Sequence, residues 1–228
     1  EELWHVFLCL LQMKNITLFL LFLPSLIYAQ QNFHKLSIGA GGGITSNRGE
    51  LNSPQKKELI IGTADYYLTP FLHGGIEAQL GKMSGQETSY NRYFENNFKA
   101  LIVSAKLHLG QFMNNSPANR NTLLTNAVKG VYAGLGTGVI KNSQQQIYRD
   151  KNNRLTMGTN SNKEIFVPVS VGIDNSGFQS RLIAGLRYQA NYVLGDQVDG
   201  YYSAGSRNDF YSNISITLKY KFGPMGIF

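Results

Sequence analysis

Residues 101–109 read LIVSAKLHL, and every second side chain of this stretch is apolar. The residues between them include Ser104, Lys106 and His108. Because successive side chains of a β-strand point to opposite faces, a period of two gives one apolar face and one mostly polar face. Residues 214–222, ISITLKYKF, repeat this alternation near the end of the chain. Both stretches predict long amphipathic strands.

Eight segments with this alternation follow one another along the chain. Each is at least as long as the roughly 9–11 residues that a tilted strand needs to cross a bilayer. An even number of such strands is typical of bacterial outer-membrane barrels. The sequence therefore predicts an all-β fold, an eight-stranded antiparallel transmembrane β-barrel with up-and-down meander topology. Its strands cover approximately residues 34–46, 57–69, 72–83, 97–109, 130–141, 164–174, 180–194 and 209–222.

The connections between these segments differ in length. Two are tight turns with Pro or Gly where turn geometry favours them, at residues 69–72 and 174–177. Four are longer and polar, as the extracellular loops of such barrels are, and they cover residues 47–56, 84–96, 142–163 and 195–208. This arrangement places the N-terminus on the periplasmic side. Residues 110–129 form one long periplasmic connection, in which a short helix is expected at about residues 119–128.

Composition and charge agree with this fold and exclude other classes. Charged residues make up 15% of the 228 residues, below the usual quarter of a soluble domain, whereas Gly (24), Tyr (13) and Phe (13) are plentiful. The net charge is +7, but the basic residues are scattered, and Lys56 and Lys57 are the one adjacent basic pair. A nucleic-acid partner is therefore not expected. A basic barrel instead favours the anionic head groups of outer-leaflet lipid, such as lipopolysaccharide.

Cysteine and ligand spacing indicate neither a disulfide nor a bound metal or cofactor. Cys9 is the single cysteine and lies in the N-terminal apolar segment. The chain after it has no spacing of His, Cys or carboxylate residues typical of a metal site. We expect no cofactor.

Residues 13–31, MKNITLFLLFLPSLIYAQQ, have the pattern of a secretory signal peptide. Lys14 supplies the positive start, residues 16–28 form the apolar region, and Ala29 precedes the expected cleavage point. These 13 apolar-region residues are too few to cross a bilayer as a helix. We therefore expect residues 1–29 to be a signal peptide with an upstream extension before Met13. Residues 30–228 are expected to form the outer-membrane β-barrel domain.

The two faces of the strands carry different residues. The apolar rows are expected outside, because lipid offers no partner for a charge. Buried charges of both signs should pair with one another. The inward face should then carry an ion-pair network that plugs the lumen, although a thin ion path remains the alternative. Its members are Asp65, Glu77, Lys106, Arg187, Lys219 and Lys221. A girdle of aromatic residues at the membrane–water boundary is expected from Tyr66, Tyr188, Tyr192, Tyr220 and Phe222.

The chain resembles the small OmpA/OmpX-like outer-membrane β-barrel proteins, particularly the Bacteroidota-type outer membrane β-barrel domain family. The resemblance rests on residues 13–30 (MKNITLFLLFLPSLIYAQ), 66–81 (YYLTPFLHGGIEAQLG), 182–201 (LIAGLRYQANYVLGDQVDGY) and 208–223 (NDFYSNISITLKYKFG). It implies a cell outer membrane location in a Gram-negative bacterium. It also implies that the barrel-assembly machinery reads Tyr220 and Phe222 in the last strand. Because the chain continues as GPMGIF, Phe228 is the alternative carrier of this signal.

Three kinds of function remain open on the sequence. An enzyme is not expected, because His34, His73 and His108 have no carboxylate nearby in sequence, and His73 is assigned to a turn. A structural or surface-interaction role, such as adhesion or binding through the outer loops, is the leading prediction, with residues 142–163 as the candidate ligand loop. The alternatives are a narrow pore for small solutes or ions, and a water-soluble lipocalin-like ligand-binding barrel.

Overall fold

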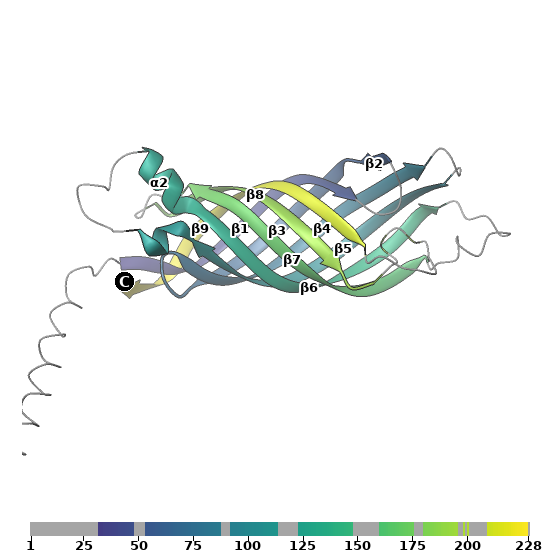
Figure 1. Cartoon of the computed structure of the whole chain (residues 1–228). Helices are drawn as coiled ribbons and strands as arrows, with labels where there is room; N and C mark the ends of the chain where they lie inside the picture. Colours follow the sequence, from purple (N-terminus) through teal and green to yellow (C-terminus); the bar gives the residue numbers. More distant parts are fainter. Residues whose placement is uncertain are drawn as a thin grey trace, which may run out of the picture.

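Eight long antiparallel strands close into a barrel in the computed structural model, which describes residues 32–47, 53–87, 92–113, 123–147, 160–175, 180–195, 198, 200 and 209–227. Each long strand pairs with the next one along the chain, and the last pairs with the first (Figure 1). The predicted eight-stranded meander is confirmed. The long strands are β1 (Asn32–Asn47), β3 (Lys57–Tyr67), β4 (Leu72–Glu87), β5 (Arg92–His108), β6 (Val131–Ile147), β7 (Ser161–Asn175), β8 (Leu182–Val193) and β9 (Phe210–Ile227).

The barrel has two unlike ends. The first residue of β1 and the last residue of β9 pair with each other, Asn32 with Ile227, and we call this end the terminal end. The opposite end, where β1 stops and β9 starts, is called the loop end. The short strand β2 (Ser53–Gln55) pairs with β4 at the loop end. None of the helices in the described ranges is long and apolar enough to cross a membrane.

The strands at the loop end are longer than predicted. β4 continues to Glu87 and β5 begins at Arg92, so most of the predicted loop 84–96 is a paired extension of the sheet. β6 likewise continues to Ile147 and β7 begins at Ser161, which makes strand of both ends of the predicted loop 142–163. The prediction was wrong here because both faces of these extensions carry polar residues, so the alternation that reveals a strand disappears.

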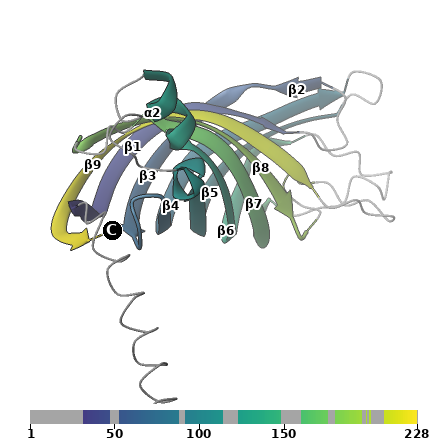
Figure 2. The same cartoon turned by 60° about the vertical axis from the view of Figure 1, so that its left-hand side comes forward.

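The long connection between β5 and β6 carries helical structure at the terminal end. A 3₁₀-helix, η3 (Leu109–Phe112), follows β5 directly, and a helix, α2 (Leu123–Gly130), leads into β6. Figure 2 shows both at the end of the barrel where the C-terminus lies. Residues 123–128 of the short helix expected at residues 119–128 are thus helical, and residues 114–122 lie outside the described ranges.

The seam between β1 and β9 runs from Asn32–Ile227 to Asn47–Tyr211, with one irregularity between His34 and Leu36. Glycine permits the close approach of the two strands. A Cβ atom built on Gly43 would lie 2.1 Å from the carbonyl oxygen of Ile214, closer than any real Cβ contact. The inward glycines of β1 therefore serve to admit the neighbouring strand.

Two layers of side chains fill the inside of the barrel. The half near the terminal end contains mostly charged and polar groups. The half near the loop end contains an apolar cluster, which the sequence reasoning did not anticipate. Its members are Leu59, Ile61, Met83, Phe94, Phe98, Ala100, Ile102, Ile140, Phe166, Val193, Val198 and Tyr211. Buried side chains thus face the barrel interior at both levels.

Candidate functional site

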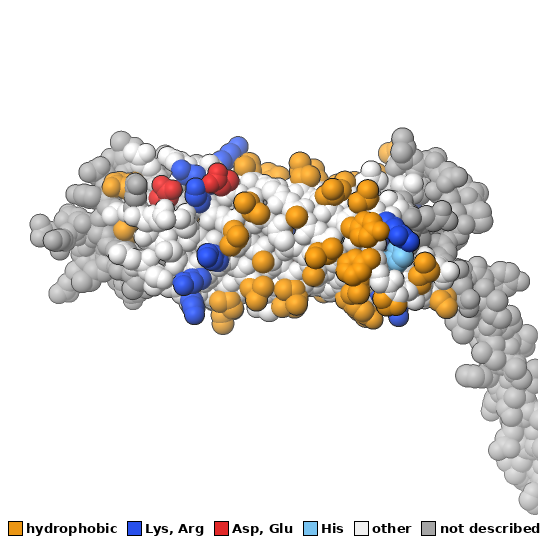
Figure 3. Space-filling view, turned by 180° about the vertical axis from the view of Figure 1, so that it is seen from behind, with side chains coloured by type: hydrophobic (Ala, Val, Ile, Leu, Met, Phe, Trp, Pro, Cys, Tyr) orange, Lys and Arg blue, Asp and Glu red, His pale blue; other side chains and the backbone are white. Residues whose placement is uncertain are grey.

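A belt of apolar side chains surrounds the barrel and faces outward. All eight long strands contribute to it, and Figure 3 shows these side chains along one face of the molecule. On β9 it runs from Ile214 to Phe222, eight residue steps. At about 3.4 Å per residue and a tilt of about 40°, this row covers roughly 20 Å along the barrel axis. Exposed members on the eight strands include Ile38, Ile60, Ile76, Leu80, Leu101, Val103, Leu135, Val139, Ile165, Val169, Leu182, Leu186, Ile214 and Ile216.

The aromatic residues predicted for a girdle all face outward, but they do not all lie at strand ends. Tyr66 lies near the terminal end of β3, and Tyr220 and Phe222 lie toward that end of β9. Tyr192 lies near the loop end of β8. Tyr188, in contrast, lies in the middle of β8, opposite Val171 and Ile214. Its place at the membrane–water boundary stays a prediction, because strand periodicity fixes which face a residue occupies but not its depth.

All six charges predicted for the lumen are buried inside the barrel. The structure brings five of them into contact through ion pairs, and it adds Asp174 from β7 to the set. The sequence reasoning missed Asp174 because it is the first residue of a predicted turn. With it, three acids face three bases in one network, so their formal charges cancel. These six are Asp65, Glu77, Asp174, Lys106, Arg187 and Lys219.

Arg187 and Glu77 form the strongest contact of this network. Their strands, β8 and β4, are opposite each other in the ring of eight. The guanidinium binds both carboxylate oxygens: Nη2 lies 2.8 Å from Oε1, and Nη1 contacts Oε2. Gln79 donates a further hydrogen bond of 2.7 Å to Oε1. Such two-point pairing fixes geometry as well as charge.

Lys219 lies between two carboxylates. Its Nζ is 3.1 Å from Oδ2 of Asp65 and 3.4 Å from Oδ2 of Asp174. Lys106 approaches Asp65 from β5 at 4.0 Å, and Ser37 donates a hydrogen bond to the same carboxylate at 3.4 Å. One ammonium group thus links β3, β7 and β9 inside the barrel.

Lys221 lies nearer the terminal end than the network. Its ammonium stands 5.5 Å from the ring centre of Tyr67, within the range of a cation–π contact. It also lines a small cavity with Phe33 and Phe71 at that end. The sixth predicted charge is therefore buried with the others but stabilised by an aromatic ring.

His73 and His108 are both buried on the lumen side of the barrel. His73 is buried within β4 and pairs with Tyr67 and Lys106 across the sheet, so its assignment to a turn is corrected. His108 directs Nδ1 at the carbonyl oxygen of Phe71, 3.1 Å away, and Nε2 lies 3.5 Å from Oδ2 of Asp174. A carboxylate distant in sequence thus reaches His108. Within the described ranges no group of three metal-ligating side chains is present.

Comparison with known proteins identifies the fold. Neisserial surface protein A (NspA) matches with a TM-score of 0.50 and 14% identity, over 82% of this chain and 97% of that one. The chain has the fold of an eight-stranded outer-membrane β-barrel. Ail of Yersinia pestis, solved with the heparin analogue sucrose octasulfate, gives a TM-score of 0.46 at 10% identity over 83% of this chain and 99% of its own. OprG, an outer membrane protein of Pseudomonas aeruginosa, gives 0.41 at 9% identity, over 84% and 98%. No protein-family model and no curated sequence matches the chain.

Proposed function

We propose that the chain is an outer-membrane barrel with a structural or surface-interaction role, and that its lumen is plugged by side chains. One observation carries the proposal: apolar side chains face outward on every long strand, while Asp65, Glu77, Asp174, Lys106, Arg187 and Lys219 are buried inside the barrel. A barrel in water has the reverse arrangement. In lipid a closed ring is favoured because it leaves no backbone group without a partner.

The cell outer membrane, a cleaved signal peptide and the Bacteroidota-type family are parts of the same proposal. The fold shared with NspA supports the membrane type. Residues 1–29 lie outside the described ranges, so the signal peptide rests on its sequence pattern. Outer-membrane lipid, including lipopolysaccharide, and the barrel-assembly machinery are the partners proposed for the barrel, with Tyr220 and Phe222 as the assembly signal.

The interaction role rests on the loop end. Residues 148–159, the centre of the proposed ligand loop, lie outside the described ranges, so the ligand stays unnamed. Recognition by loops carried on a rigid barrel is a common arrangement. We expect no catalytic activity, because His108 and Asp174 are both buried in the lumen network.

The lumen supports a plug better than the pore alternative. The two-point Arg187–Glu77 pair connects opposite walls of the barrel, and the apolar cluster lies between this pair and the loop end. An ion would have to displace both layers to pass. The lipocalin-like alternative requires an apolar cavity for a ligand, whereas Phe98, Phe166 and Tyr211 occupy that space.

Three measurements test the proposal. The full chain should sediment with outer membranes and should migrate faster on a gel before heating than after it, as folded barrels do. Reconstituted in planar bilayers, it should give no steady conductance steps. Recovery as a soluble, heat-insensitive protein would refute the membrane barrel, and steady single-channel steps would replace the plug with the pore.

A further inference from the structure

Three lysines form one row across neighbouring strands, at the border of the apolar belt that is nearer the loop end. Lys99 on β5 pairs with Lys141 on β6, and Lys141 pairs with Lys163 on β7. All three face outward and are exposed. We call these three residues the lysine row. Figure 3 shows lysine or arginine side chains gathered between the apolar belt and the loop end.

The lysine row is unfavourable for the isolated protein. Side chains directly opposite each other on paired strands approach to about 5 Å, and like charges in that position destabilise a sheet. In the described part of the chain, no carboxylate lies within ion-pair distance of any of the three ammonium groups. A counter-charge from outside the protein would relieve this repulsion.

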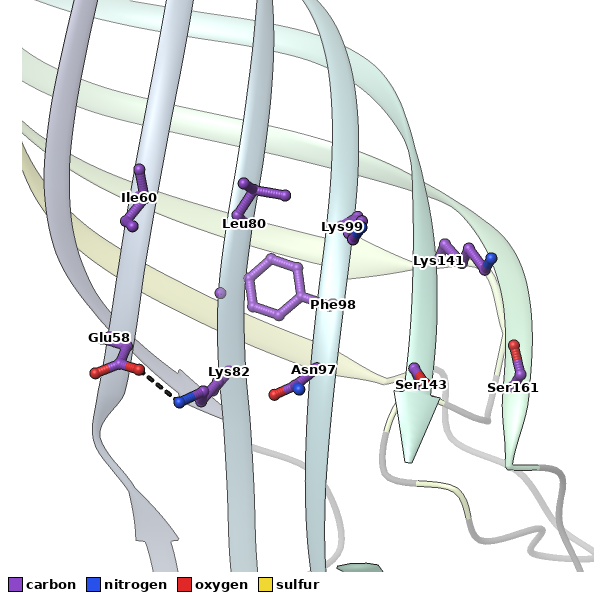
Figure 4. A pocket seen from close by; sticks show the side chains of 11 residues that line it. Glu58, Ile60, Leu80, Lys82, Asn97, Phe98, Lys99, Lys141, Ser143 and Ser161 are labelled. Carbon is purple, nitrogen blue, oxygen red and sulfur yellow. Dashed lines mark ion pairs between the residues drawn. The ribbon is translucent and has the colours of Figure 1, made fainter. Parts of the chain in front are cut away.

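Lys82 shows the contrast on the adjacent strand. It lies on β4 opposite Asn97, two residues nearer the loop end than the partner of Lys99, and its ammonium is 2.7 Å from Oε1 of Glu58 on β3 (Figure 4). The chain therefore supplies an acid to this lysine from the same surface. Among the described residues, no carboxylate is paired with the lysine row.

Three layers of residues follow one another along β5, β6 and β7. Two residues from the lysine row toward the barrel centre stand exposed apolar side chains, Leu101, Val139 and Ile165, which also pair across the strands. Two residues in the other direction stand Asn97, Ser143 and Ser161, again as cross-strand partners. The surface thus changes from apolar to cationic to hydrogen-bonding within five residues of each strand.

A groove on the outer wall contains two lysines of the row and the whole Asn and Ser layer. It has a volume of about 670 Å³, and Ile60, Leu80 and the Glu58–Lys82 pair also line it. Figure 4 shows Lys99 and Lys141 on neighbouring strands beside Leu80. A pocket of this size accommodates a lipid headgroup, and the apolar belt continues from it toward the barrel centre.

We propose that the lysine row binds the phosphorylated headgroup of an outer-leaflet lipid, whose acyl chains lie against Leu101, Val139 and Ile165. The charge complements phosphate, the apolar layer complements acyl chains, and the Asn and Ser layer complements sugar hydroxyls. This site rests on the proposed function, because the loop end must face the outer leaflet. The lipid is then bound at one site on the outer wall of the barrel, unlike the bulk lipid that surrounds the rest of the belt.

The test measures binding of two lipid probes to the full chain folded in detergent micelles. The probes are lipid A carrying both phosphates and the same lipid A after enzymatic removal of both. The variant is Lys99→Gln/Lys141→Gln/Lys163→Gln. A control, Lys35→Gln/Lys56→Gln/Lys57→Gln, removes equal charge from lysines outside the row. We expect at least about tenfold weaker binding of the phosphorylated probe to the row variant and no comparable change in the control.

Each other outcome overturns the proposal. Equal loss in both variants would mean that net charge alone attracts the lipid, and no loss in either would remove the site. Wild-type protein gives a measurement independent of variant folding, because it must bind the dephosphorylated probe much more weakly. Complete displacement of lipid by inorganic phosphate would assign the groove to the free anion. Failure of the proposed function is recognised separately, since wild-type protein would then lack heat-dependent mobility.

Discussion

Arg187 on β8 holds Glu77 on β4 across the full width of the barrel, with Nη2 2.8 Å from Oε1. The two strands share no backbone hydrogen bonds, because three strands separate them in either direction around the ring. The pair therefore couples walls that the sheet itself connects only indirectly.

Replacing Arg187 by Met should lower the free energy of unfolding by about 3–5 kcal/mol, because Glu77 would remain buried without its partner. Urea unfolding in lipid vesicles measures this. Removing both charges, as Arg187→Met/Glu77→Leu, should recover part of the loss. Glu58→Gln is the matched control, since it breaks the exposed pair with Lys82 and should lower the free energy of unfolding far less than Arg187→Met. Equal effects of Arg187→Met and Glu58→Gln would contradict the buried network.

The loss of unfolding free energy caused by a charge on the outer surface should depend on how deep in the lipid that charge lies. Ile216 lies exposed near the middle of the belt, and Leu194 lies exposed next to the loop end of β8. Arginine at position 216 should cost about 2–4 kcal/mol of unfolding free energy in vesicles, whereas arginine at position 194 should cost about 0–1 kcal/mol. The same unfolding measurement checks both. In water an exposed Ile→Arg change would be neutral, so two small effects would refute the membrane belt.

Alanine substitutions at two glycines test whether β1 and β9 approach each other too closely to admit a side chain. Gly43 has no room for a Cβ, whereas a Cβ on Gly62 of β3 would meet nothing within 4 Å. Gly43→Ala should destabilise the barrel by about 1–3 kcal/mol through overpacking. Gly62→Ala should be neutral or stabilising by up to about 1 kcal/mol, because it restricts the unfolded chain. The fraction of folded protein on an unheated gel and the unfolding midpoint measure the difference, and a reversed order would rule out the close seam.

The apolar cluster in the lumen should contribute strongly to stability. Phe98 is buried inside the cluster, whereas Phe112 in η3 is largely exposed. Phe98→Ala should cost about 3–5 kcal/mol, as in other packed cores. Phe112→Ala should change the unfolding free energy by less than about 0.5 kcal/mol. If Phe98→Ala changed the unfolding free energy equally little, the half of the lumen near the loop end would not be closely packed.

The alternation of apolar and polar residues was sufficient to predict the barrel and the face that each belt residue occupies. It placed Lys106 and Lys219 inside because each stands between apolar neighbours on a strand. It could not reveal the loop-end extensions such as residues 142–145, which are all polar. It also gave no depth along the strand, so the place of Tyr188 relative to the boundary stays a prediction.

The sequence pattern could not predict contacts between strands that lie far apart in the sequence. Asp174 joins Lys219 and His108 only because the closed ring turns β7, β9 and β5 toward one centre. The lysine row was also missed, since its three residues are separated by 42 and 22 positions and meet only through strand register. Register depends on the turns and bulges between strands rather than on composition.

The pairing of β1 with β9 has a consequence for how the protein is made. β1 gains its second neighbour only when residues 210–227 are present, so a partly formed sheet has two open edges. Open edges invite pairing with other chains. A chain truncated before residue 210 could not close them, and we expect it to aggregate. Closure of this barrel is therefore an all-or-none event decided by the eighteen residues of β9.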